Sequence, residues 1–220
     1  MITENLEKIR KELPEHVQLV AVSKTKPIED LQEAFDAGQR IFGENKVQEM
    51  AAKWEMLPKE IEWHFIGHLQ RNKVKYLAPF VSLIHGVESF KLLKEINKQA
   101  LKSNRIIDVL LQFYIADEET KFGLSKEEAE VLLSSEEFKL LQNIRIRGVM
   151  GMATFTKDQE KIRGEFQKLK TIHSDLLKKH FSGVHVFDTV SMGMSGDYSI
   201  AIDEGSTMIR IGSSIFGFRN

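Results

Sequence analysis

The strongest constraint on the fold is a regular alternation of short apolar runs with segments of helical spacing. Apolar, β-branched runs of four to ten residues are typical of strands that are buried on both faces. Eight such runs are expected to be strands, at residues 17–23, 40–43, 62–66, 81–85, 106–115, 143–149, 184–187 and 206–211. Amphipathic helical segments separate them, which is the pattern of a parallel sheet whose crossovers are helices.

Further signals mark where helices begin. Apolar residues recur at helical spacing before the first strand, at Ile2, Leu6, Ile9 and Leu13. Residues 125–128 and 156–159 both fit the capping-box pattern, which marks a helix start.

No linker-like or low-complexity stretch interrupts this alternation. The predicted fold class is therefore α/β, a single (β/α)8 barrel domain of TIM type over residues 1–220, preceded by an N-terminal helix. An open doubly wound sheet is the alternative, although it would normally contain fewer strands at this length.

Composition excludes several classes of function. The chain has 31 basic and 32 acidic residues, and this balance predicts no nucleic-acid or anionic membrane partner. It has no cysteine, hence no disulfide and no thiolate metal site, and no metal ligands are predicted. Because the first 13 residues lack the apolar core of a signal peptide, a cytoplasmic protein is expected.

Lys24 directly follows the first predicted strand. In parallel α/β folds, ligands and chemistry collect at this carboxyl end of the strands. Lys24 shares a strand face with Val20 and Val22, whereas Lys26 precedes Pro27 and is expected in a turn. A lone lysine there is most often a solvated residue at the start of a loop.

Glycines and hydroxyl residues cluster in residues 188–196 and 212–214, which are expected to follow the last two strands. Barrels often bind phosphate there, through backbone N–H groups and the start of a short helix. Taken alone, such a loop is more often only a turn.

Closure of a barrel places its last strand beside its first, so this cluster and Lys24 would face one cavity. A phosphorylated aldehyde could then be held by its phosphate and joined to Lys24 as a Schiff base. Pyridoxal 5′-phosphate (PLP) fits that description, and Arg210 could face its ring nitrogen. An ion pair with a carboxylate is the other reading of Arg210.

Six motifs support a family resemblance. AVSKTKP, FGENKVQEM, WHFIGHLQRNK, GVMGMAT, SMGMSGDYSIAI and GSTMIRIGSSIFG, in this order, resemble the YggS/PROSC family of PLP homeostasis proteins. The resemblance extends from about Val17 to Gly217, and it implies a barrel similar to the N-terminal domain of alanine racemase.

The resemblance also implies roles for individual residues. Lys24 would be the Schiff-base lysine, and Arg210 would face the pyridine nitrogen. The remaining implied roles are Asn45 in the cofactor pocket, Ser191, Gly212 and Ser213 at the phosphate, and His64 and Met152 as pocket neighbours.

The family role implied in this way is PLP homeostasis, that is, binding, buffering or handing on the cofactor without catalytic turnover. Arg210 can only donate hydrogen bonds, so the ring nitrogen would be an unprotonated acceptor and a weak electron sink. Racemases of this fold also use a tyrosine from an extra β-domain, and none of the three tyrosines here matches it.

Two alternatives stay open, namely a PLP-dependent amino-acid racemase or lyase and a barrel that binds another phosphorylated ligand without a covalent bond. A monomer is expected, because the dimer-forming β-domain is missing from the sequence. The candidate partners are PLP itself, PLP-dependent apoenzymes and PLP-producing enzymes.

Overall fold

The chain forms a closed barrel of eight parallel strands, in the order β1 to β8. The computed structural model describes residues 1–116, 123–183 and 186–217. Its strands are β1 (Gln18–Val22), β2 (Ile41–Glu44), β3 (Glu62–Phe65), β4 (Leu83–Val87), β5 (Ile107–Gln112), β6 (Ile144–Met150), β7 (Thr189–Met194) and β8 (Met208–Ile211). β1 pairs with β8 as well as with β2, which closes the sheet and confirms the predicted barrel.

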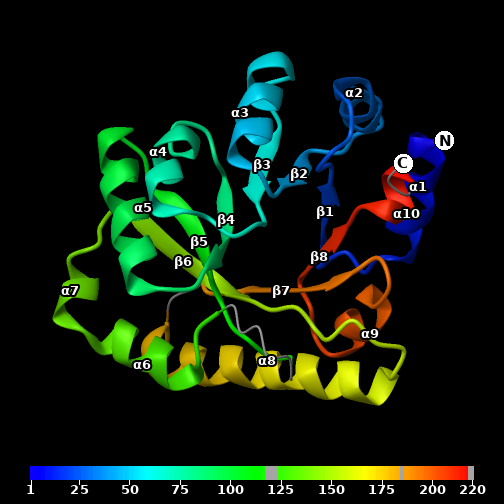
Figure 1. Cartoon of the computed structure of the whole chain (residues 1–220). Coiled ribbons are helices and arrows are strands. Elements are labelled where there is room, and N and C mark those ends of the chain that lie inside the picture. The colour runs from blue at the N-terminus through cyan, green and yellow to red at the C-terminus, as the bar shows by residue number, and fades with distance from the viewer. Residues whose placement is uncertain (117–122, 184–185, 218–220) are drawn as a thin grey trace.

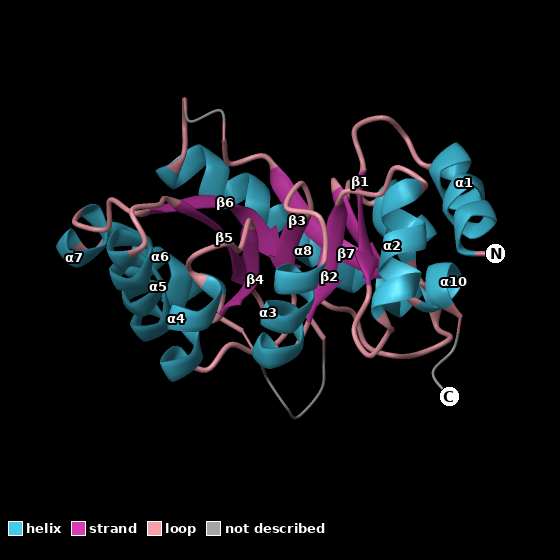
Figure 2. Cartoon of the chain, turned by 90° about the horizontal axis from the view of Figure 1, so that it is seen from above, coloured by secondary structure: helices cyan, strands magenta, loops and turns pink. Residues whose placement is uncertain are grey.

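Helices surround the strands and follow one another around them in chain order (Figure 1). They are α1 (Ile2–Glu12), α2 (Ile28–Asp36), α3 (Val47–Met56), α4 (Val74–Leu77), α5 (Phe90–Lys102), α6 (Lys126–Ser134), α7 (Glu136–Lys139), α8 (Gln159–His180), α9 (Tyr198–Asp203) and α10 (Ser213–Phe216), with a 3₁₀ turn at Arg71–Lys73. Figure 2 shows α1, α2 and α10 together at one end of the molecule. Among the described helices, none combines the length and the apolarity that crossing a bilayer requires.

The N-terminal helix and one capping box agree with the sequence patterns. In α1, Leu6 and Ile9 are buried. At α6, the Glu128 N–H donates to Ser125 Oγ at 3.1 Å, and the Ser125 N–H donates back to Glu128 Oε2 at 2.8 Å.

The second capping box was wrong. The side chain of Asp158 caps α8 instead, through a 3.1 Å bond from the Lys161 N–H. The helix therefore begins two residues later than predicted, because a carboxylate nearer the first turn accepts the free N–H groups better.

The seventh strand lies later in the chain than predicted. Residues 184–185 of the predicted run lie outside the described residues, Val186 is in a turn, and β7 begins at Thr189. The apolar side chain of Phe187 packs outside the sheet, where its ring stacks on Phe181 and on His173 of α8. Most of the expected 188–196 loop is therefore strand.

One layer of the barrel interior is apolar. Five buried side chains pack together there, from β1, β4, β5, β6 and β8, namely Val20, Leu83, Leu110, Met150 and Met208. Side chains two residues further along a strand share its face and lie nearer its carboxyl end. His85 thus follows Leu83, and Arg210 follows Met208, which places polar groups on top of the apolar cluster.

Candidate functional site

A polar layer crosses the barrel on the side of this apolar cluster that is nearer the carboxyl ends of the strands. It consists of His64, His85, Ser191 and Arg210. All four side chains are buried. Arg210 Nη1 donates to Ser191 Oγ at 2.5 Å, and Ser191 Oγ lies 3.1 Å from His85 Nδ1. His85 Nε2 lies 3.1 Å from His64 Nδ1. The layer therefore joins β3, β4, β7 and β8 through the barrel interior.

The guanidinium of Arg210 is the fixed donor at one end of the layer. A guanidinium only donates, so Ser191 Oγ accepts from Arg210 and its own hydroxyl proton can go to His85 Nδ1. With the proton of Ser191 on that bond, His85 donates from Nε2 to His64 Nδ1 and His64 carries its proton on Nε2. Arg210 Nη2 also donates to the Gly151 carbonyl at 3.1 Å, which holds the guanidinium plane.

Burial keeps the two histidines neutral. It lowers the pKa of His64 to about 3. Burial also lowers the pKa of His85 well below its ordinary value, and the nearby His64 and Arg210 add to the shift. The pKa of Arg210 falls to about 10 through burial, so Arg210 is still protonated at neutral pH.

These pKa shifts predict a loss of stability in mild acid. Between about pH 6.5 and pH 3 the unfolded chain binds a proton on His64 that the folded chain does not. The free energy of unfolding therefore decreases as the pH is lowered through this range. From pH 6.5 to pH 5 the His64 contribution is about 2 kcal/mol. Urea denaturation at both pH values should show a smaller loss in His64→Gln than in wild type. The exposed His16 supplies the control His16→Gln, and equal losses in all three proteins would contradict the assignment.

The structure separates Lys24 from Lys26. Lys24 lies in the turn directly beyond β1, and its side chain is partly buried. The alternation of the strand would carry Lys24 on the face of Val20, which lies in the interior cluster. Lys26 Nζ donates instead to the Phe216 carbonyl at the end of α10, at 2.8 Å. Between the two lysines, Thr25 has a φ of +66°, which turns the chain sharply after Lys24. Lys24 thus lies at the carboxyl end of β1, and the polar layer lies toward the same end of the barrel.

Asn45, directly after β2, brings an unsatisfied polar atom to the site. Its Oδ1 is buried and has no hydrogen-bond partner among the described residues. The adjoining strand ends are packed closely, because a Cβ on Gly67 would lie 2.5 Å from the Asn45 carbonyl and one on Gly86 would lie 2.6 Å from the Gly67 carbonyl. A buried acceptor without a partner fits a polar ligand in the barrel mouth.

The end of β8 supplies backbone N–H groups. Gly212 and Ser213 lie at the start of α10, where the first N–H groups of a helix have no acceptor within it. The Gly212 N–H donates to Ser195 Oγ at 3.3 Å, so Ser195, which lies in the predicted 188–196 cluster but was given no role of its own, also belongs to this corner.

Two other predicted residues take different places. Ser191 lies within β7 in the polar layer, since β7 begins later than the sequence pattern suggested. Met152 is 42% exposed beyond β6. Sequence patterns gave His85 no role, because its partners come from strands far away in the chain.

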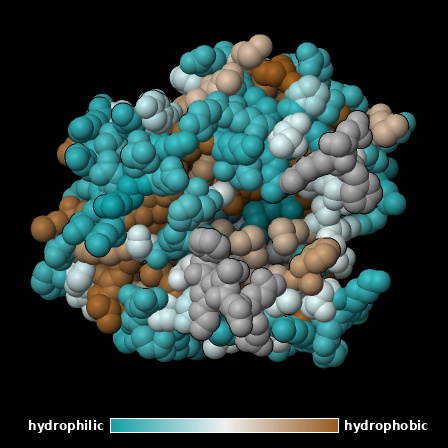
Figure 3. Space-filling view, in the orientation of Figure 1, coloured by the Kyte–Doolittle hydropathy of each residue, from teal (hydrophilic) through white to brown (hydrophobic). Residues whose placement is uncertain are grey.

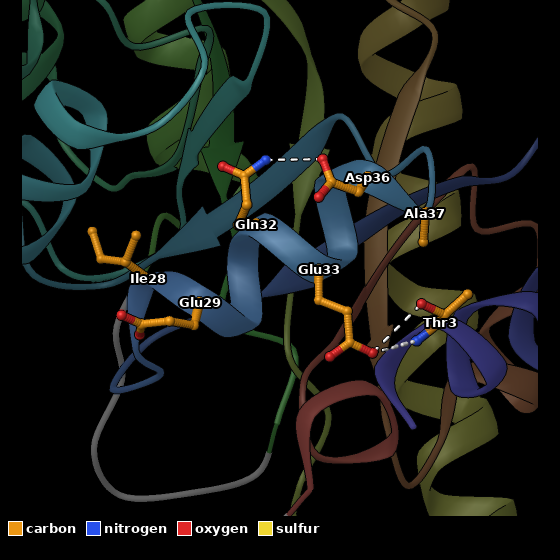
Figure 4. A pocket seen from close by; sticks show the side chains of 7 residues that line it. All are labelled: Thr3, Ile28, Glu29, Gln32, Glu33, Asp36 and Ala37. Atoms are coloured by element: carbon orange, nitrogen blue, oxygen red, sulfur yellow. Dashed lines mark hydrogen bonds between the residues drawn. The ribbon is translucent and has the colours of Figure 1, made fainter.

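The surface is hollowed near the middle of the helix ring, and hydrophilic atoms lie inside the hollow (Figure 3). A second depression lies outside the barrel, along α1 and α2 (Figure 4). Its walls carry Glu29, Glu33 and Asp36, and Glu33 is bonded to the backbone N–H of Thr3 at 3.3 Å. This groove contains none of the predicted site residues.

Comparisons with known proteins define the class of the chain. Residues 1–220 match the family model described as the alanine racemase N-terminal domain. Alanine racemase of Clostridium difficile has a TM-score of 0.78 at 16% identity, over 99% of this chain and 56% of that one. At this identity the likeness shows the fold alone.

Other relatives are more similar. A pyridoxal phosphate homeostasis protein of Aquifex aeolicus is 40% identical over 204 residues, which are 92% of this chain and 87% of the relative. PipY of Synechococcus elongatus without PLP has a TM-score of 0.92 at 34% identity, over 99% of this chain and 100% of that one. PipY has also been solved with PLP bound, with a TM-score of 0.89 and the same coverage. The chain therefore belongs to the pyridoxal phosphate homeostasis proteins, which carry the alanine racemase N-terminal domain.

Proposed function

We propose that this protein binds PLP in the barrel mouth, as a Schiff base on Lys24, and serves PLP homeostasis by holding the cofactor and handing it on. The observation that carries the proposal is the position of Lys24 just beyond the end of β1, the strand that pairs with β8 and its buried Arg210. The PLP-bound PipY structure and the homeostasis relatives support it.

The residues present fit this cofactor. Arg210 would donate to the pyridine nitrogen, and the N–H groups at Gly212 and Ser213 would bind the phosphate. Asn45 Oδ1, which is buried without a described partner, would accept a hydrogen bond in the pocket. Ser191 positions Arg210 by accepting its hydrogen bond, and its contact with the phosphate stays a prediction.

We further propose that the protein does not turn over a substrate. When bound, PLP supplies an electron sink, and the strength of this sink depends on protonation of its ring nitrogen. Arg210 has only donors, so it favours the unprotonated nitrogen and weakens the sink. The exchange partners would be PLP-producing enzymes and PLP-dependent apoenzymes, and we expect the protein to act as a monomer.

A hydrogen-exchange experiment separates carrier from enzyme. PLP-loaded protein incubated with L-alanine in deuterated water should leave the Cα proton in place, because the electron sink is weak. Proton NMR measures the exchange, and an alanine racemase serves as the positive control. Deuterium at Cα that disappears in Lys24→Ala would instead favour the racemase or lyase alternative, which rests on the same lysine at an open mouth.

A further inference from the structure

We propose that the buried Glu44 and Lys53 and the partly exposed Glu49 form a clamp that fixes the turn carrying Lys24 and so directs its amine into the barrel mouth. The three are positioning residues, since none of them is placed in the cofactor pocket. The proposal rests on the proposed role of Lys24, and it gives a part in that role to three residues of β2 and α3 outside the polar layer. Glu44 and Glu49 lie in the FGENKVQEM motif, which assigned no role to either of them, and Lys53 lies outside all six motifs.

Lys53 is the centre of the clamp. It projects from α3, is 5% exposed, and donates from Nζ to three oxygens. These are Glu44 Oε1 at 2.8 Å, Glu49 Oε1 at 2.7 Å and the Ser23 carbonyl at 2.9 Å. An ammonium group has three protons, so all of them are used. One of the three acceptors is the backbone of the residue directly before Lys24.

The clamp also holds the residue directly after Lys24. The Thr25 N–H donates to Glu49 Oε1 at 2.6 Å. Thr25 is β-branched and has a φ of +66°, a strained conformation for such a residue that persists only where the surroundings impose it. Contacts with Lys53 and Glu49 therefore fix the backbone on both sides of Lys24.

Glu44 ties the clamp to β1 from the other side. Its side chain is fully buried at the end of β2, and Ser23 Oγ donates to its Oε1 at 2.6 Å. Glu44 Oε2 has no partner among the described residues. Burial raises the pKa of Glu44, against the opposing effect of Lys53. Burying such a group adds little to stability, whereas it can specify a single backbone conformation.

The test compares two ligands that enter the same pocket. PLP can bond to Lys24, whereas pyridoxine 5′-phosphate has an alcohol in place of the aldehyde and cannot. In Lys53→Met, which keeps the length of the side chain without its charge, we expect the affinity for PLP to fall at least about tenfold, while the affinity for pyridoxine 5′-phosphate stays within about twofold of wild type. The rate of Schiff-base formation at saturating PLP, followed by stopped-flow absorbance, should also fall.

Two further variants keep the test decisive. Glu49→Ala removes the acceptor of the Thr25 N–H at a partly exposed position, and it should show the same split between the ligands if Lys53→Met fails to fold. Lys126→Met breaks a partly buried ion pair with Asp175 between α6 and α8, outside the clamp, and should leave both affinities unchanged.

The outcomes distinguish the proposal from its premise. Equal losses for both ligands would show a merely structural role, and wild-type affinity and rate for PLP in both clamp variants would also overturn the proposal. If wild type itself formed no Schiff base, the proposed role of Lys24 would fail, whatever the variants did.

Discussion

Lys24→Ala is expected to abolish the visible Schiff-base absorbance of the PLP-loaded protein. The amine at the end of β1 is the group that we expect to bond with the cofactor aldehyde, so its loss removes the covalent contact altogether. The affinity for PLP should fall at least about tenfold, or 1.4 kcal/mol. Contacts of the phosphate with the start of α10 would remain, so weak binding without the band is the predicted result, measured by spectrophotometric titration.

Lys26→Ala is the matched control. Lys26 lies two residues further on and donates to the Phe216 carbonyl, away from the polar layer. We expect this variant to keep the absorbance band and nearly the wild-type affinity. A band that persisted in Lys24→Ala and vanished in Lys26→Ala would exchange the roles of the two lysines.

Gly148→Ala is expected to destabilise the barrel by at least about 4 kcal/mol. Gly148 lies in β6 with a φ of +151°, and a Cβ there would lie 1.8 Å from the Thr189 carbonyl oxygen of β7. Both atoms belong to paired strands, so neither can move without opening the sheet. Urea denaturation followed by circular dichroism measures the change.

Gly164→Ala tests the sign of this argument. Gly164 lies within α8, and a Cβ there would meet nothing within 4 Å. Alanine favours a helix interior over glycine by about 1 kcal/mol, so this variant should be more stable than wild type. Similar losses in both variants would contradict the close approach of β6 and β7.

The order of strands and the place of Lys24 could be predicted because they depend on local patterns. The apolar run before Lys24 is long enough to mark a strand and its end. The predicted position of β7 was wrong because the strand contains Ser191 and Gly193, a composition typical of loops. The apolar Phe187, which suggested an earlier strand, packs on α8 instead. Gly193 has a φ of +97°, which glycine tolerates within the strand.

The polar layer and the clamp could not be predicted from local patterns. His85 and Ser191 are 106 residues apart, and only closure of the barrel brings them within 3.1 Å. Lys53 lies in an amphipathic helix, where lysine is usually exposed. Its burial depends on how α3 packs beside the end of β1, which sequence spacing does not reveal.

The measurement that tests the central claim most directly is reduction of the PLP-loaded wild-type protein with borohydride, followed by peptide mapping of the modified lysine by mass spectrometry. The account predicts one modified residue, Lys24. A modification on Lys26, one spread over surface lysines, or none at all would contradict it.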